Sequence, residues 1–161
     1  MNNSCDVLVA GGGVSGTAAA VAAARCGAKT VLSEKEDFLG GTGYAGLFQY
    51  ICGLYLNGAD NPAETLNAGI AREIAAMLNK LSPHRTAKKI GQVYVLPYSR
   101  EDFAAVLNSL CQDETDLTVL NNASVVTVEN DLPVLPWHPL RSAGSDRVNI
   151  LSVTIRQQGV Q

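Results

Sequence analysis

The stretch from Cys5 to Glu34 constrains the fold more than any other part of the chain, because it places a glycine-rich turn between two structured runs. It reads CDVLVAGGGVSGTAAAVAAARCGAKTVLSE. The continuous apolar run predicts a central, buried strand over 5–10, the alanine-rich run a thin helix over 15–26, and the next apolar run a second strand over 29–33. This order, closed by an acid at Glu34, is the pattern of a dinucleotide-binding βαβ unit.

Three glycines of this turn have separable physical roles. Gly11 allows a sharp turn out of the strand, Gly13 leaves bare backbone for a pyrophosphate, and Gly16 lets the helix pack closely against the sheet. The free N–H groups at the helix N-terminus attract the phosphate anion. Glu34 follows at about the 20-residue spacing expected of a carboxylate that accepts hydrogen bonds from ribose hydroxyls. The predicted cofactor-binding residues of this unit are Gly11, Gly13, Val14, Ser15, Gly16, Glu34 and Lys35.

Length and composition are those of one globular domain over 1–161. Apolar residues make up 47% of the 161 residues and charged residues 17%. The formal net charge of −3 gives no sign of a nucleic-acid partner. The longest low-polarity run, residues 16–24, is too short and too rich in alanine to span a bilayer, and the N-terminus lacks a signal-peptide pattern. We therefore expect a cytoplasmic protein without a membrane span.

The four cysteines are widely spaced and, with two lone histidines, do not form a cluster of metal ligands. Metal binding is therefore not expected. We interpret Cys5, Cys26 and Cys111 as buried free thiols. Cys52 is considered separately below.

The remaining patterns predict further helices and strands. Asn61, Pro62 and Glu64 form a helix start, and apolar residues recur at helical spacing up to Leu81, which predicts an amphipathic helix over 62–81. The other predicted segments are a basic loop over 84–90, a strand over 91–96, a helix over 100–112 capped by Ser99, strands over 117–120 and 124–128, a proline-rich loop over 129–146 and a last strand of a hairpin-like substructure over 147–156.

A second glycine cluster, which follows Glu34, makes a family resemblance specific. The pattern GGGxxGxxAAxxAARxGAKTxLxEKxxFLGG resembles the N-terminal portion of FAD-dependent oxidoreductases of the glutathione-reductase-like superfamily. The resemblance implies an α/β, Rossmann-like FAD-binding βαβ domain with a parallel sheet and a small β substructure at its C-terminal end. It implies FAD as the cofactor, with Gly40, Gly41 and Thr42 alongside it. An ordinary glycine turn is the alternative.

The resemblance also assigns two later segments. The apolar and aromatic residues 44–58 correspond to a region below the flavin ring, so Cys52 would lie near the flavin as a redox partner or attachment point. The alternative, which we favour, is that Cys52, Tyr50 and Tyr55 pack in a core. Val125, with Val126 as the neighbouring possibility, corresponds to the residue whose backbone contacts the adenine. A plain buried valine is an equal alternative.

The family's chain continues beyond the part that this sequence resembles. An apolar strand ending in an Ala-Thr-Gly motif, a later Gly-Asp motif and the substrate-binding domain do not occur in the 161 residues. The domain is thus incomplete relative to the family, and two explanations are open. The chain is either one subunit of a split flavoenzyme, completed by a second polypeptide that also binds a small-molecule substrate, or it is a fragment. No catalytic residue can be assigned. The function expected is that of an FAD-binding portion of an oxidoreductase; the alternatives are a non-catalytic nucleotide-binding subunit and a nicotinamide-dependent enzyme, although Glu34 would repel the 2′-phosphate of NADP.

Overall fold

A three-stranded parallel sheet contains the two strands that flank the glycine turn. In the computed structural model, which describes residues 5–58, 64–130 and 150–157, the strands are β1 (Val7–Ala10), β2 (Thr30–Ser33) and β6 (Leu117–Leu120). Their order in the sheet is β1-β2-β6, and both pairings are parallel. The predicted α/β class with a parallel sheet is confirmed.

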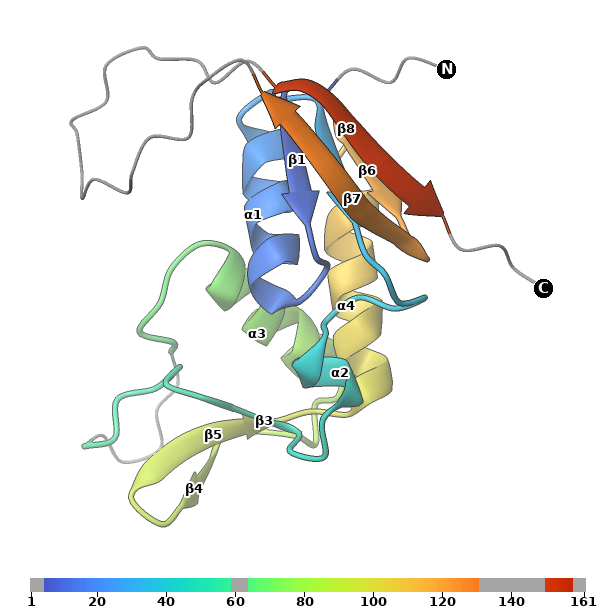
Figure 1. Cartoon of the computed structure of the whole chain (residues 1–161). Coiled ribbons are helices and arrows are strands. Elements are labelled where there is room, and N and C mark those ends of the chain that lie inside the picture. Colours follow the sequence, from blue (N-terminus) through green and yellow to red (C-terminus); the bar gives the residue numbers. More distant parts are fainter. Residues whose placement is uncertain (1–4, 59–63, 131–149, 158–161) are drawn as a thin grey trace, which may run out of the picture.

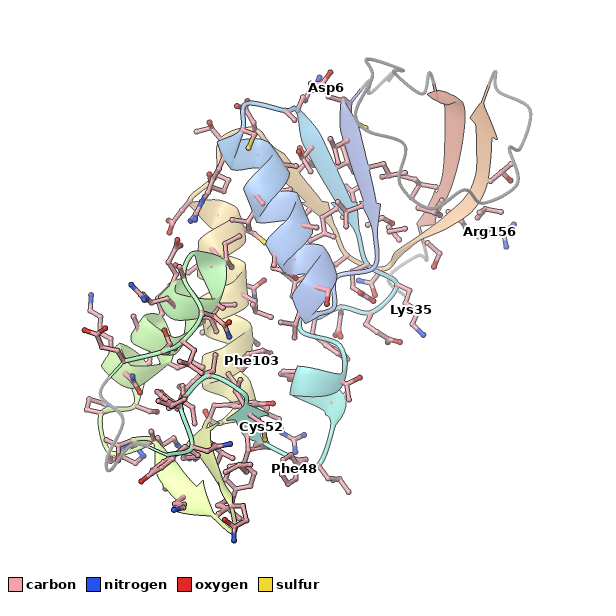
Figure 2. The ribbon with its side chains drawn as sticks, turned by 90° about the vertical axis from the view of Figure 1, so that its left-hand side faces the viewer. Asp6, Lys35, Phe48, Cys52, Phe103 and Arg156 are labelled. Carbon is pink, nitrogen blue, oxygen red and sulfur yellow. The ribbon has the colours of Figure 1, made fainter. Side chains whose placement is uncertain are left out.

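The sheet lies between a helical layer and a β-hairpin (Figures 1 and 2). On one face are α1 (Val14–Arg25) and α4 (Arg100–Gln112), and on the other is the antiparallel pair β7 (Ala123–Asn130) and β8 (Ile150–Gln157). This hairpin is the β substructure predicted at the C-terminal end. Of the predicted loop over 129–146, residues 131–146 lie outside the described residues.

Local sequence signals fix the ends of both helices. Gly27 follows the last turn of α1 with a φ of +81°, the left-handed conformation in which glycine commonly ends a helix. Ser99 precedes α4, and its side-chain oxygen accepts the backbone N–H of Asp102 at 3.1 Å. The helix predicted over 100–112 is confirmed with both ends at the predicted residues.

The prediction that the first strand is central and buried is wrong for the described residues. There, β1 pairs with β2 alone and forms the edge of the sheet. Val7, Leu8 and Val9 are only half-buried, and Ala10 is exposed. The continuous apolar run indicated a strand that is suited to burial on both faces. The sequence of a strand does not show, however, whether other strands pair with both of its edges.

The helix predicted over 62–81 begins later than expected. The observed α3 spans Ile70–Leu81, and the predicted cap residues at 61–63 lie outside the described residues. Gly69 has a φ of +65°, which interrupts helical backbone, and the described residues before it are not helical. The N–H of Leu66 instead donates to the carbonyl of Leu54 at 2.7 Å.

A small antiparallel sheet occupies the end of the molecule away from the β7-β8 hairpin (Figure 1). After the one-turn helix α2 (Thr42–Ala45), it is formed by β3 (Tyr50–Cys52), β4 (Lys88–Ile90) and β5 (Val93–Pro97), in the order β3-β5-β4. The last residues of the predicted basic loop over 84–90 therefore form a strand. The reason is Gly91, whose φ of +60° allows a two-residue hairpin turn.

The hydrophobic core joins these layers. Apolar side chains of α1, α3, α4 and the small sheet form one cluster around fully buried residues, among them Val21, Leu32, Leu39, Leu96 and Leu107. Within the described residues, no helix has the length and apolar character needed to cross a bilayer.

Candidate functional site

The turn between β1 and α1 depends on glycine at its first and last positions. Gly11 has a φ of +103°, which L side chains rarely adopt, and its N–H donates to the carbonyl of Ser33 at 2.7 Å. A Cβ atom on Gly16 would lie 1.9 Å from the carbonyl oxygen of Gly11. The close approach at Gly16 is therefore made mainly to the turn itself, whereas the sequence had indicated the sheet.

The two glycine clusters, which are distant in the sequence, lie side by side in the structure. Gly13 forms a parallel β-bridge with Gly40, and the N–H of Gly40 donates to the carbonyl of Gly12 at 2.8 Å. A Cβ on Gly41 would lie 3.2 Å from the Cα of Gly13. We call residues 11–13 together with Gly40 and Gly41 the glycine cradle.

The cradle has the features that a pyrophosphate requires. A Cβ on Gly13 would meet no atom within 4 Å, so the space beside this residue is open. Gly13 is also the N-cap of the 12-residue helix α1, whose first N–H groups receive no side-chain cap. Bare backbone, open space and the positive end of a helix dipole suit an anion, so the residues present fit the phosphates of a dinucleotide.

Glu34 lies behind the cradle and is already hydrogen-bonded to it. Its carboxylate accepts the backbone N–H of Gly12 on one oxygen and that of Glu36, at 2.9 Å, on the other. The residue is 7% exposed. A carboxylate has further lone pairs on both oxygens, so acceptor capacity remains for ribose hydroxyls. Besides the predicted ribose contact, Glu34 thus has a structural role in bracing the glycine turn.

Gly12 is the site residue that sequence reasoning missed. A Cβ there would lie 2.5 Å from Leu39 and 3.0 Å from the Cβ of Glu34. Glycine at this position is therefore what allows the Glu34 carboxylate to reach the backbone. The available signal was the unbroken run of three glycines, of which the general fingerprint requires only the first and third.

The other predicted site residues differ in how close they lie to the cradle. Val14 and Ser15 form the exposed first turn of α1, and Thr42 is exposed at the start of α2, directly after Gly41. Lys35 is solvent-exposed and pairs with Glu36 at 3.5 Å (Figure 2). The side chain of Lys35 is thus paired with Glu36 and not with a residue of the cradle.

Val125 belongs to a strand whose start is tied to Glu34. The backbone N–H of Glu34 donates to the carbonyl of Leu120 at 2.9 Å, and the N–H of Ala123 donates to the carbonyl of Glu34 at 2.8 Å. Two residues farther on, Val125 is half-buried, and Val126 is 50% exposed. The strand β7 therefore starts beside the acid predicted to bind the ribose.

The predictions of burial are corrected at three of the four cysteines. Cys52 and Cys26 are exposed, Cys5 is half-buried and Cys111 is buried. Burial raises the pKa of the Cys111 thiol to about 11, which keeps it protonated. Tyr55 is in the core, as favoured, but Tyr50 is only half-buried and Cys52 is exposed. Alternation along a three-residue strand does not reveal which face is covered.

The described residues contain no group of three or more histidine, cysteine, aspartate or glutamate side chains that could hold a metal ion. The carboxylate with the deepest burial, Glu34, is occupied by backbone donors. The part of the site that these residues form therefore consists mainly of backbone, with Glu34 as its buried carboxylate.

Comparisons with known proteins agree with this assignment. A model of the FAD dependent oxidoreductase family matches residues 6–156. The chain is 50% identical to the flavin-containing amine oxidase B of Rattus norvegicus over 44 residues, which are 27% of this chain and 8% of that protein.

Two solved structures resemble the fold. Thermovibrio ammonificans THI4 matches 95% of this chain with a TM-score of 0.54 and 16% identity, and Aquifex aeolicus GidA matches 78% with a TM-score of 0.51 and 22% identity. The chain covers 48% and 20% of those two chains, so it spans less than half the length of each.

Proposed function

The chain belongs to the FAD-dependent oxidoreductase family, and we propose that its own residues hold the ADP half of FAD. The glycine cradle is the observation that carries this proposal, because its open space at Gly13 lies at the N-terminus of α1 and next to a buried carboxylate. When bound, the flavin supplies hydride or electron transfer at its ring. The chain's part is to bind and orient.

Each part of the cradle has a role in this proposal. Backbone N–H groups of Gly13, Val14 and Ser15 bind the pyrophosphate, and Gly11 and Gly16 hold the turn that presents them. Glu34 accepts the ribose hydroxyls while it braces Gly12. Gly40, Gly41 and Thr42 line the cofactor on the side where Gly40 forms the β-bridge with Gly13. Lys35 flanks the ribose, and the backbone of Val125 faces the adenine.

We further propose a second polypeptide that completes the site, which makes the enzyme a cytoplasmic hetero-oligomer. Two observations support this. Within the described residues, β1 has an unpaired edge, and the relatives of known structure are more than twice as long as the matched part. The second polypeptide would add a strand beside β1 and contribute the groups that bind the small-molecule substrate.

The test is the visible spectrum of the purified chain, followed by denaturation and identification of any nucleotide that is released. We expect flavin absorption bands and free FAD. If the preparation is colourless, the apo chain should be titrated with FAD by calorimetry. A colourless chain that also fails to bind added FAD contradicts the proposal.

A non-catalytic nucleotide-binding subunit is the second candidate. It is favoured by the make-up of the cradle, which is glycine backbone beside one carboxylate, Glu34, that is already hydrogen-bonded to backbone N–H groups. Calorimetric titration with FAD, ADP and NAD separates the two functions. Equal affinity for ADP and FAD would favour the non-catalytic subunit, whereas a clear preference for FAD would show that the chain also contacts the flavin half.

A further inference from the structure

In the small sheet β3-β5-β4, one set of side chains packs against the hydrophobic core cluster and the other set lies outside that cluster. Because side chains alternate along strands, the paired residues of the three strands divide into two sets. Ile51 pairs with Leu96, and Ile51, Tyr94 and Leu96 pack against the hydrophobic core; Lys89, which pairs with Tyr94, is exposed on strand β4. The opposite set points outward and is exposed at Lys88, Ile90 and Val93, although Val95 in the middle of β5 is buried.

Large apolar side chains are exposed on this outward side. Ile90 and Val93 are paired at the β4-β5 turn and are 43% and 39% exposed. Leu47 and Phe48, in the loop from α2 to β3, are 97% and 65% exposed. Figure 2 shows Phe48 and Cys52 at the same end of the molecule as the β4-β5 hairpin, far from Asp6 and Arg156.

Tyr50 connects the loop to the hairpin. Its ring lies 4.9 Å from that of Phe48, and the Nζ of Lys88 lies 5.0 Å from its centroid. The exposed apolar residues therefore form one surface with an aromatic ring and a cation between them. We call this surface the hairpin face; its residues are Leu47, Phe48, Tyr50, Lys88, Ile90 and Val93.

The hairpin face lies in the most basic part of the chain. Residues 80–93 contain four lysines and arginines and no acid, although the whole chain carries −3. Asp102 of α4 accepts the hydroxyl of Ser82, and this hydrogen bond, with a smaller contribution from the nearby Arg85, lowers the pKa of Asp102. Lys88 and Lys89 lie over the rings of Tyr50 and Tyr94, and among the described residues neither forms an ion pair with a carboxylate.

We propose that the hairpin face docks on the surface of an anionic lipid bilayer. Exposed leucine, phenylalanine, isoleucine and valine side chains can enter the boundary between headgroups and acyl chains, while lysines on the same structure meet the anionic headgroups. A tyrosine between the two is suited to the interface. A second copy of the chain is a poorer occupant, because a face-to-face dimer would bring the lysines of both copies together.

The experiment is co-sedimentation of the full chain with vesicles. We expect binding to vesicles that contain phosphatidylglycerol in phosphatidylcholine, and little binding to vesicles of phosphatidylcholine alone. Binding should weaken as salt is raised, because salt screens the contribution of the lysines. Equal binding to both kinds of vesicle, or binding to neither, would overturn the proposal.

Two variants test the two components of the face. Lys88→Glu, with Lys89→Glu at the neighbouring exposed position of β4, should weaken binding to the anionic vesicles at least about tenfold, since each basic residue near the surface contributes. Leu47→Ser with Phe48→Ser keeps every charge and should also weaken binding severalfold. If the serine variant binds as the original chain does, the apolar residues do not enter the bilayer and the proposal fails.

A matched control separates the hairpin face from net charge. Lys29→Glu with Arg156→Glu makes the same change in charge, but Lys29 adjoins Asp6, and Arg156 lies on β8, at the other end of the molecule (Figure 2). This variant should bind vesicles like the original chain. An equal loss in both double variants would mean attraction by net charge alone, and a sedimentation-velocity dimer lost in the serine variant would assign the face to a second copy instead.

Discussion

The glycine cradle and the hairpin face differ in the atoms that they offer for binding: backbone in the cradle, side chains in the hairpin face. The cradle consists of residues that lack side chains, held by a backbone hydrogen bond from the N–H of Gly40 to the carbonyl of Gly12 and by a hydrogen bond from the N–H of Gly12 to the carboxylate of the buried Glu34. The hairpin face consists of side chains that project from a small sheet into solvent. One added Cβ atom can therefore destroy the first region, whereas the second tolerates large substitutions. Variants ordered by size of effect test this contrast.

The largest effect is expected from Gly16→Ala. The new Cβ would lie 1.9 Å from the carbonyl oxygen of Gly11, and backbone on both sides prevents an easy adjustment. We expect the free energy of unfolding to fall by about 3 kcal/mol or more, the upper range for overpacking. Urea denaturation measures it. Gly58→Ala is the control, because a Cβ at Gly58 meets nothing within 4 Å; similar losses in both variants would contradict the close packing of the turn.

Gly13→Val should separate binding from folding. Gly13 has a φ of −62°, and its Cβ position is open, so the fold accommodates the side chain. The valine would fill the space of the pyrophosphate. We expect FAD affinity to fall at least about a hundredfold, which corresponds to about 2.8 kcal/mol, with the urea midpoint nearly unchanged. Calorimetric titration beside denaturation tests this, and undiminished affinity would place the phosphates elsewhere.

Glu34→Ala should affect both properties at once. It removes the acceptor of two backbone N–H groups, those of Gly12 and Glu36, and also the predicted ribose acceptor. Unpaired donors of this kind cost about 1–3 kcal/mol, so we expect losses of that size in unfolding free energy and in FAD affinity. Glu36→Ala, which keeps its backbone N–H, is the control. A change confined to affinity would show that the contact with Gly12 does not stabilise the turn.

A smaller effect is expected where three helices meet. The Arg25 guanidinium contacts Glu73 at 2.9 Å and Glu114 at 2.7 Å, and this contact lowers the pKa of Glu73. Because the side chains of Arg25 and Glu73 are in contact with solvent and only that of Glu114 is more deeply buried, Arg25→Met should cost about 0.5–1 kcal/mol near neutral pH.

The cost of Arg25→Met should depend on pH. A lowered pKa in the folded state means that the contribution of Glu73 is present above its unfolded pKa and is lost as the pH falls through the folded value. The difference between the variant and the original chain, measured by denaturation, should therefore shrink below about pH 4. A difference that stays constant would indicate a packing effect.

The smallest effect on stability is expected on the hairpin face. Phe48→Ser and Ile90→Ser replace exposed side chains and should change the unfolding free energy by no more than about 0.5 kcal/mol. Leu96, on the inner face of the same sheet, is fully buried, and Leu96→Ala should cost about 2–5 kcal/mol. Comparable losses would contradict the difference in burial between Leu96 and the two exposed residues.

Short-range signals predicted the parts of the fold that are built locally. The βαβ unit from Cys5 to Glu34 follows from apolar runs and a glycine turn that are contiguous in sequence, and the cap at Ser99 needs only its neighbours. The prediction of where α3 begins was wrong because the helix-start pattern of Pro62 and Glu64 is outweighed by the left-handed backbone of Gly69.

Long-range arrangements were beyond the sequence. The bridge from Gly13 to Gly40 and the hydrogen bond from Gly12 to Glu34 bring together residues that no periodicity relates. The edge position of β1 and the exposure of Cys52 are also properties of what lies beside a segment. The residue types of the candidate site were therefore predictable, but their mutual support was not.

The position of β2 determines when the cradle can become stable during synthesis. This strand lies between β1 and β6, and β6 is formed by residues 117–120, far later in the chain. The N–H of Glu34 has its acceptor on Leu120. A nascent chain that ends before Leu117 therefore holds the glycine turn but lacks the strand that anchors its acid. Closing so long a loop is slow, so maturation of the cofactor site should coincide with late rather than early folding.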